Sequence, residues 1–255
     1  MTVKSRKEEL KDILKRLNSG EPTEKIKAEA RELLEEIDPK ELSEAEQELI
    51  EEGLPETELR HLCTAHIEAM AEELEALKTE VPVGHPLHTL IVEHDEILKI
   101  LDRLEEANKQ IHKLDAYDQN NSVFAELKDI SQGLLDTEKH HEREEEALFP
   151  EVDLTGVTGP TRIMRMEHED LWPRKEKIAE LSEEVEDMDF SRFKEELGLN
   201  AEYIVLTLRD HIFKENNILY PTAKEVIAEE KWEEIKKLSD EIGYCSFTPE
   251  EEINN

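Results

Sequence analysis

The stretch HHEREEEALFP (residues 140–150) returns in altered form as HIFKENNILYP (residues 211–221). Both stretches place a glutamate four residues after a histidine and end in leucine, an aromatic residue and proline. Residues four apart lie on the same face of a helix, so each stretch can present an imidazole and a carboxylate to one partner. The spacing alone is weak evidence in a glutamate-rich chain, where it also arises as a solvated ion pair.

An EH dipeptide precedes each stretch at a similar distance. Glu93-His94 lies 46 residues before His140, counted between the histidines, and Glu167-His168 lies 43 residues before His211. The chain therefore contains two similar helical hairpins, each with one histidine followed by a histidine and a glutamate. Packed face to face, the hairpins would bring six polar side chains together in the middle of a bundle.

The composition favours helix almost throughout. Charged residues make up 38% of the 255 residues, and the chain has only 8 glycines and 10 prolines. We expect an all-α protein, an up-down four-helix bundle with a small N-terminal helical domain. The four long helices are expected at residues 87–112, 122–149, 160–186 and 191–226.

The breaks in the pattern predict four parts. They are an N-terminal helical domain (1–78), a linker (79–86), the bundle (87–228) and a C-terminal helix and tail (229–255). The linker prediction rests on two prolines and one glycine in TEVPVGHP.

The charge and the cysteines exclude several classes of function. Sixty-six acidic against 32 basic residues give a formal charge of −34, which repels phosphate backbones and anionic lipids. We therefore expect no nucleic acid or membrane partner, and a soluble, cytoplasmic protein without a signal peptide. Cys63 and Cys245 are too few for a disulfide framework, a cysteine-based zinc site or an iron–sulfur cluster. Any metal would need histidine and carboxylate ligands.

Helical periodicity places several of the repeated residues in the core. His94 falls near the centre of the apolar stripe of its helix, whereas His85 and His88 are expected at the surface or the helix start. His211 and Glu215 continue an apolar row, and His168 lies beside Met164 and Leu171. A buried carboxylate is costly unless it is paired or binds a metal.

The second helix leaves its register open. Both His140/Glu144 and His141/Glu145 have the HxxxE spacing, and the apolar row Leu127, Leu134, Leu148 favours the second pair. Alignment with the later stretch favours the first pair, which a π-bulge would bring to the correct face. We select His140 and Glu144 and keep His141 and Glu145 as alternates or as groups that support the ligands.

Imidazole and carboxylate without thiolate suit iron or manganese as well as zinc. Four histidines and two glutamates supply two sites of two histidines and one carboxylate, or one dinuclear site bridged by Glu144 and Glu215. Such sites leave coordination positions open to small ligands.

These motifs resemble the hemerythrin-like, His-His-Glu cation-binding family. The matching pieces are VEHDEI, HHEREEEALFP, GPTRIMRMEHEDL and HIFKENNILYP, which cover the chain from about residue 85 to 226. The resemblance implies a four-helix bundle with two non-haem, carboxylate-bridged iron ions. The ligands that it implies are His94, His140, Glu144, His168, His211 and Glu215.

The resemblance also implies a function. The implied function is that of a non-haem di-iron protein that binds or responds to O2, NO or peroxide, in iron handling or in oxidative or nitrosative stress. The alternative is a di-iron oxidoreductase that reduces peroxide or NO, or oxidises ferrous iron, on the same scaffold. Oxygen-carrying relatives have a further histidine where Trp172 stands and an aspartate where Asn216 stands, so the four-histidine, two-glutamate set is more similar to the subgroup linked to iron–sulfur repair and nitric oxide stress.

Residues before the bundle, with the tail SDEIGYCSFTP, are similar to an uncharacterised helical domain often found ahead of hemerythrin-like bundles. A protein partner would bind through residues 1–78.

Two other interpretations compete with the metal site. One is a ferritin-like site using ELRH (58–61) and EKHH (138–141). The other is a metal-free helical adaptor, in which the buried histidines and glutamates would pair with one another. His61, Cys63 and His66 in RHLCTAHIEAM could approach a metal, but the interpretation as ordinary helix residues is favoured.

Overall fold

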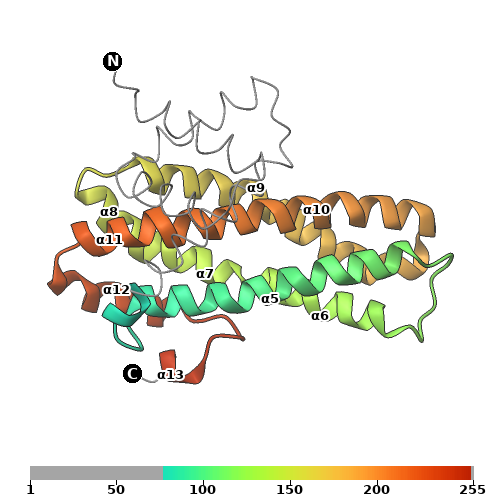
Figure 1. Ribbon diagram of the computed structural model, residues 1–255, viewed down its shortest axis with the longest axis horizontal. Helices are drawn as coiled ribbons and strands as arrows, with labels where there is room; N and C mark the ends of the chain where they lie inside the picture. Colours follow the sequence, from blue (N-terminus) through green and yellow to red (C-terminus); the bar gives the residue numbers. More distant parts are fainter. Residues whose placement is uncertain (1–76, 254–255) are drawn as a thin grey trace, which may run out of the picture. The chain divides into compact units, whose positions relative to one another are not determined.

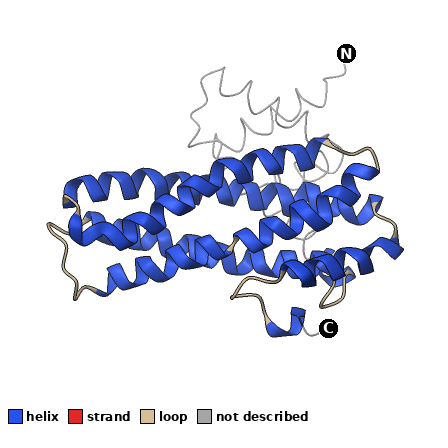
Figure 2. Cartoon of the chain, turned by 180° about the vertical axis from the view of Figure 1, so that it is seen from behind, coloured by secondary structure: helices blue, strands red, loops and turns tan. Residues whose placement is uncertain are grey.

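The computed structural model describes residues 77–253, and every regular element in that range is a helix (Figure 2). Four long helical segments lie side by side (Figure 1). The first is α5 (Pro86–His112), and the third is α9 (Gly159–Glu184) with a 3₁₀ turn at Val185–Asp187. The second comprises α6 (Ser122–Asp136), α7 (Glu138–Arg143) and α8 (Phe149–Leu154). The fourth comprises α10 (Phe190–Lys214) and α11 (Tyr220–Val226).

The four segments form an up-down bundle. Helix α5 packs against α6 and α10, and α9 packs against the same two helices. The starts of these helices follow from capping side chains. His85 Nδ1 accepts a hydrogen bond from the Leu87 amide ahead of Pro86, Asn121 caps α6 and Asp189 caps α10. The predicted four-helix bundle is confirmed.

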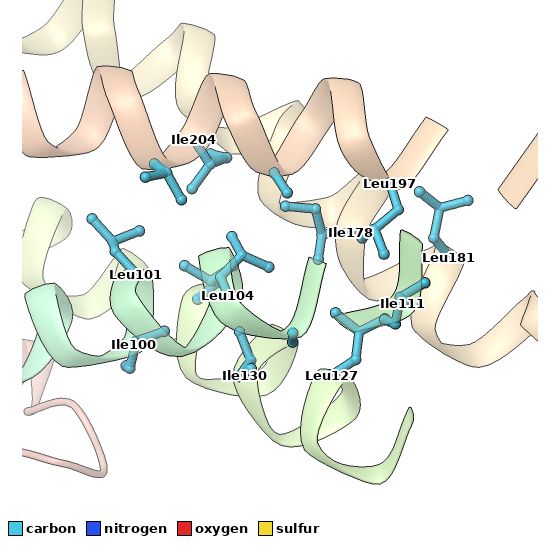
Figure 3. Packing of buried hydrophobic residues seen from close by; sticks show 14 of the residues in the cluster. Ile100, Leu101, Leu104, Ile111, Leu127, Ile130, Ile178, Leu181, Leu197 and Ile204 are labelled. Atoms are coloured by element: carbon cyan, nitrogen blue, oxygen red, sulfur yellow. The ribbon is translucent and has the colours of Figure 1, made fainter. Parts of the chain in front are cut away.

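One half of the bundle is filled by an apolar cluster (Figure 3). It uses the C-terminal halves of α5 and α9 and the facing parts of α6 and α10, so it lies toward the α5–α6 and α9–α10 connections. Leu101, Leu104, Leu127 and Ile178 in this cluster are fully buried. The cluster holds the helices together and leaves the other half of the bundle for polar side chains.

Two π turns interrupt the second and fourth segments. They span Glu144–Leu148 and Glu215–Leu219, at matching places of the repeat. The sequence predicted continuous helices at 122–149 and 191–226, with a π-bulge considered in the helix at 122–149. The structure also separates α6 from α7 at Thr137. Each π turn rotates the side chains that follow it relative to those before it.

The C-terminal part lies against the polar half of the bundle. After a 3₁₀ turn at Glu229–Lys231, α12 (Trp232–Ile242) packs against α5, α7 and the first π turn, and α13 (Glu250–Ile253) follows. The expected short helix after the bundle is present. The N-terminal domain at 1–78 lies outside the described residues except for its last two positions.

Candidate metal centre

Six buried side chains converge in the polar half of the bundle. They are the predicted set His94, His140, Glu144, His168, His211 and Glu215, and each is at most 4% exposed. Helices α5, α7, α9 and α10 each contribute one histidine, and each π turn begins with one of the glutamates. The structure thus brings together all the residues that the repeat singled out.

The first histidine pair consists of His94 and His140. Their Nε2 atoms are 3.1 Å apart. Glu215 Oε2 lies 3.1 Å from His94 Nε2, and Glu144 Oε2 lies 3.6 Å from His140 Nε2. Ligand atoms of His94, His140 and Glu215 therefore lie within 4.8 Å of one another, with Glu144 beside them.

The second histidine pair consists of His168 and His211, whose Nε2 atoms are 3.0 Å apart. Glu215 Oε1 lies 2.8 Å from His211 Nε2, and Glu144 Oε2 lies 3.6 Å from His168 Nε2. Each glutamate thus approaches both histidine pairs.

The glutamates of the two EH dipeptides orient histidines on the next helix. Glu93 Oε2 is 2.8 Å from His140 Nδ1, and Glu167 Oε2 is 2.8 Å from His211 Nδ1. A hydrogen bond at Nδ1 fixes the ring so that Nε2 faces the centre. The sequence showed these glutamates as part of a repeat but did not reveal this role.

The residues that follow the two central glutamates orient the other two histidines. Glu145 Oε1 is 2.7 Å from His168 Nδ1, and Asn216 Oδ1 is 2.8 Å from His94 Nδ1. Glu145, considered as an alternate ligand, thus contacts Nδ1 of His168, the ring nitrogen that faces away from the centre. Asn216, noted as a departure from oxygen carriers, takes the equivalent place in the second hairpin.

His141 is also buried beside the centre. Its ring stacks on that of His168, with centroids 3.9 Å apart, and its Nδ1 lies 3.4 Å from Lys175 Nζ. One ligand atom each of His141, His168 and His211 fall within 4.8 Å of one another. The two registers considered for the second helix are therefore compatible, because His140 joins the first pair and His141 lies against the second.

Two family models match the chain, and together they cover most of its residues. The hemerythrin HHE cation binding domain matches residues 85–223, and a family of unknown function, DUF438, matches residues 10–76. The chain belongs to the hemerythrin HHE cation-binding family. No curated protein matches the chain significantly.

The hemerythrin-like domain has the features of a cation-binding site in its own side chains. Glu144 Oε2 and both carboxylate oxygens of Glu215 are buried without a hydrogen-bond partner among the described residues. Buried carboxylate oxygens without donors are costly unless a cation compensates them. The donor set therefore fits a metal.

The two central glutamates have different electrostatic surroundings. Burial and the negative charge of Glu215 raise the pKa of Glu144 well above its ordinary value. Burial also opposes ionisation of Glu215, but the charge of His211 holds the pKa of Glu215 well below its ordinary value. A bound cation would favour the ionised form of both carboxylates.

Three buried residues near the centre were missed by sequence reasoning. Tyr220 donates a hydrogen bond to Glu144 Oε1 over 2.8 Å, and Arg143 pairs with Glu93. Lys175 Nζ donates to Thr137 and Glu138. The repeated LFP and LYP endings were the available indication for Tyr220, whereas Arg143 and Lys175 are indistinguishable in sequence from surface cations.

Other candidate residues lie away from the centre. Cys245 is buried beside Arg143, and Glu138 of the ferritin-like motif EKHH pairs with Lys175. His88 is not at the open surface, because Glu252 Oε1 covers it at 2.8 Å, and its ring is only 13% exposed. His61, Cys63, His66 and the motif ELRH lie outside the described residues. No helix within residues 77–253 is long and apolar enough to cross a membrane.

Proposed function

We propose that this hemerythrin-like domain binds two iron ions in a carboxylate-bridged centre. His94 and His140 would hold one ion, His168 and His211 the other, and Glu144 and Glu215 would bridge them. The observation that carries the proposal is the pair of Nε2–Nε2 distances, 3.1 and 3.0 Å, with each carboxylate shared between the two pairs. Two histidines and carboxylates per metal, without thiolate, suit non-haem iron.

The function that we propose is binding of, or response to, O2, NO or peroxide. Iron with open coordination positions supplies the chemistry that binds such ligands. The chain's own residues hold the imidazoles in one orientation through Nδ1 and bury the centre between four helices. Because the surrounding helices limit the access of water to the centre, we expect a small uncharged ligand to reach it more readily than a large or charged one.

We also propose the domain organisation predicted from sequence, with residues 1–78 as a separate helical domain and 229–255 as a C-terminal helix and tail. The DUF438 match at residues 10–76 supports the first boundary. A protein partner would bind through this N-terminal domain, while the bundle binds the small ligand.

Replacing one predicted ligand tests the proposal. We expect His211→Ala to lose at least one of two irons per chain while the far-ultraviolet circular dichroism stays helical, because the apolar cluster does not depend on the centre. The matched control is His112→Ala, because His112 is the last residue of α5, the helix that contains His94, and its Nδ1 lies 2.9 Å from the carbonyl oxygen of Asn108 in the same helix. Elemental analysis measures both variants.

Two results would contradict or redirect the proposal. Unchanged iron content in His211→Ala would contradict the assignment of His211 as an iron ligand. Saturable reduction of peroxide or NO by the reduced wild-type protein, rather than stoichiometric binding, would instead identify an oxidoreductase.

A further inference from the structure

Tyr220 brings a phenol oxygen to the first histidine pair. Its side chain is fully buried, and its ring stacks on that of His94, with centroids 5.4 Å apart and planes 10° apart. The Oη atom lies 3.4 Å from His94 Nε2 and 3.4 Å from His140 Nε2. It also donates to Glu144 Oε1 over 2.8 Å.

These distances are those between neighbouring ligand atoms of a single cation. Two donors at about 2.1 Å from a metal and at right angles are about 3.0 Å apart. The two Nε2 atoms of the first pair are 3.1 Å apart, and Glu215 Oε2 is 3.1 Å from one of them. Tyr220 Oη lies 3.4 Å from each Nε2 atom, which is longer than this spacing by only a few tenths of an ångström.

We infer that Tyr220 Oη is a ligand of the iron held by His94 and His140. This inference rests on the proposed di-iron centre and goes beyond its histidine and glutamate ligands. On binding iron(III), the phenol O–H bond would break, an Fe–O bond would form, and the proton would leave to solvent. A trivalent cation offsets the burial that otherwise favours the neutral phenol.

The repeat shows that the two histidine pairs differ at this position. Phe149 occupies the place in the first HxxxE stretch that Tyr220 occupies in the second, five residues after the glutamate. The Phe149 ring stacks near His168, with centroids 6.0 Å apart, but it offers no donor atom. The phenol would therefore fill one coordination position on the first iron, whereas the equivalent position on the second iron stays available to an exogenous ligand.

A visible spectrum tests the inference, because phenolate bound to iron(III) gives a charge-transfer band that imidazole and carboxylate do not give. The full-length apoprotein would be loaded with ferrous iron without oxygen and then oxidised. We expect a visible phenolate band in the wild-type protein and its loss in Tyr220→Phe, at unchanged iron content. The matched control is Tyr203→Phe, since the Tyr203 hydroxyl donates to Asp170 on the outside of the bundle; this variant should keep the band.

Resonance Raman of the wild-type protein with ring-deuterated tyrosine keeps the inference testable should Tyr220→Phe fail to fold. Isotope-sensitive phenolate modes enhanced in the visible band support it. Two bound irons without such modes, or a band retained in Tyr220→Phe, would overturn the inference and leave the di-iron centre intact. A wild-type protein that binds no iron would overturn both.

Discussion

At the scale of single residues, each histidine of the centre is positioned by a group on a neighbouring helix. Glu93 illustrates this arrangement, because its carboxylate is fully buried between His140, Arg143 and Thr248. Burial alone would raise the pKa of Glu93, but hydrogen bonding to His140 and the charge of Arg143 lower it to about 2. Glu93 therefore stays ionised and keeps His140 Nε2 directed at the centre.

His85 gives a prediction for pH dependence. Burial, followed by repulsion from Lys224, lowers the pKa of His85 from 6.5 to about 4, although Glu229 acts in the opposite direction. The unfolded chain therefore binds this proton first as the pH falls. Stability is complete above pH 6.5 and decreases as the pH falls toward 4, by about 1–2 kcal/mol once partial exposure is allowed for.

His85→Asn separates this titration from helix capping, because asparagine also caps a helix start but does not titrate. We expect the variant to unfold in urea with a flatter pH dependence between pH 6.5 and 4 and with little change at pH 7. An unaltered pH dependence would show that other groups cause the effect.

At the scale of elements, the π turns and the C-terminal tail shape the centre. The π turns let His140/Glu144 and His211/Glu215 face inward while Phe149 and Tyr220, five residues after each glutamate, still face the same site. The tail reaches the centre through Thr248, whose hydroxyl donates to Glu93. The family match ends at residue 223, so this contact comes from outside the matched domain.

Thr248→Val tests the role of the tail. The substitution keeps the shape of the side chain and removes a hydrogen bond to a buried carboxylate, so we expect the free energy of unfolding to fall by about 1.5–2 kcal/mol. Iron should also dissociate faster from the first histidine pair, because Glu93 orients His140. Ile253→Ser in the same segment is the control, since Ile253 is 40% exposed. Equal stability of the two variants would show that the Thr248 contact contributes nothing.

At the scale of the molecule, the bundle separates stability from chemistry. One half is the apolar cluster (Figure 3), and the other contains the buried polar side chains of the centre. Because the apolar cluster holds the four helices together, the bundle tolerates the cost of burying carboxylates close to one another in its other half.

Leu104→Ala tests this division. Leu104 is fully buried in the apolar cluster, so its truncation should lower the free energy of unfolding by about 2–5 kcal/mol. Iron content should stay the same, because Leu104 lies away from the six predicted ligands. Leu154→Ala, at a side chain that is 78% exposed, should change neither quantity. Loss of iron in Leu104→Ala would show that the two halves are coupled.

The sequence by itself determined the helices and the chemistry of their inner faces. Periodicity placed His94 in the core, and the repeat selected six residues that the structure brings together, because both depend on local spacing along a helix. Their role as iron ligands stays a prediction.

Only the tertiary structure decided how the side chains meet across helices. It placed His140 in one pair and His141 against the other, paired each Nδ1 with a residue of a neighbouring helix, and brought Tyr220 and Thr248 to the site. These contacts depend on how far each helix is rotated about its axis. One residue corresponds to about 100° of rotation, so the π turns change which side chains face the centre in a way that spacing along the chain does not specify.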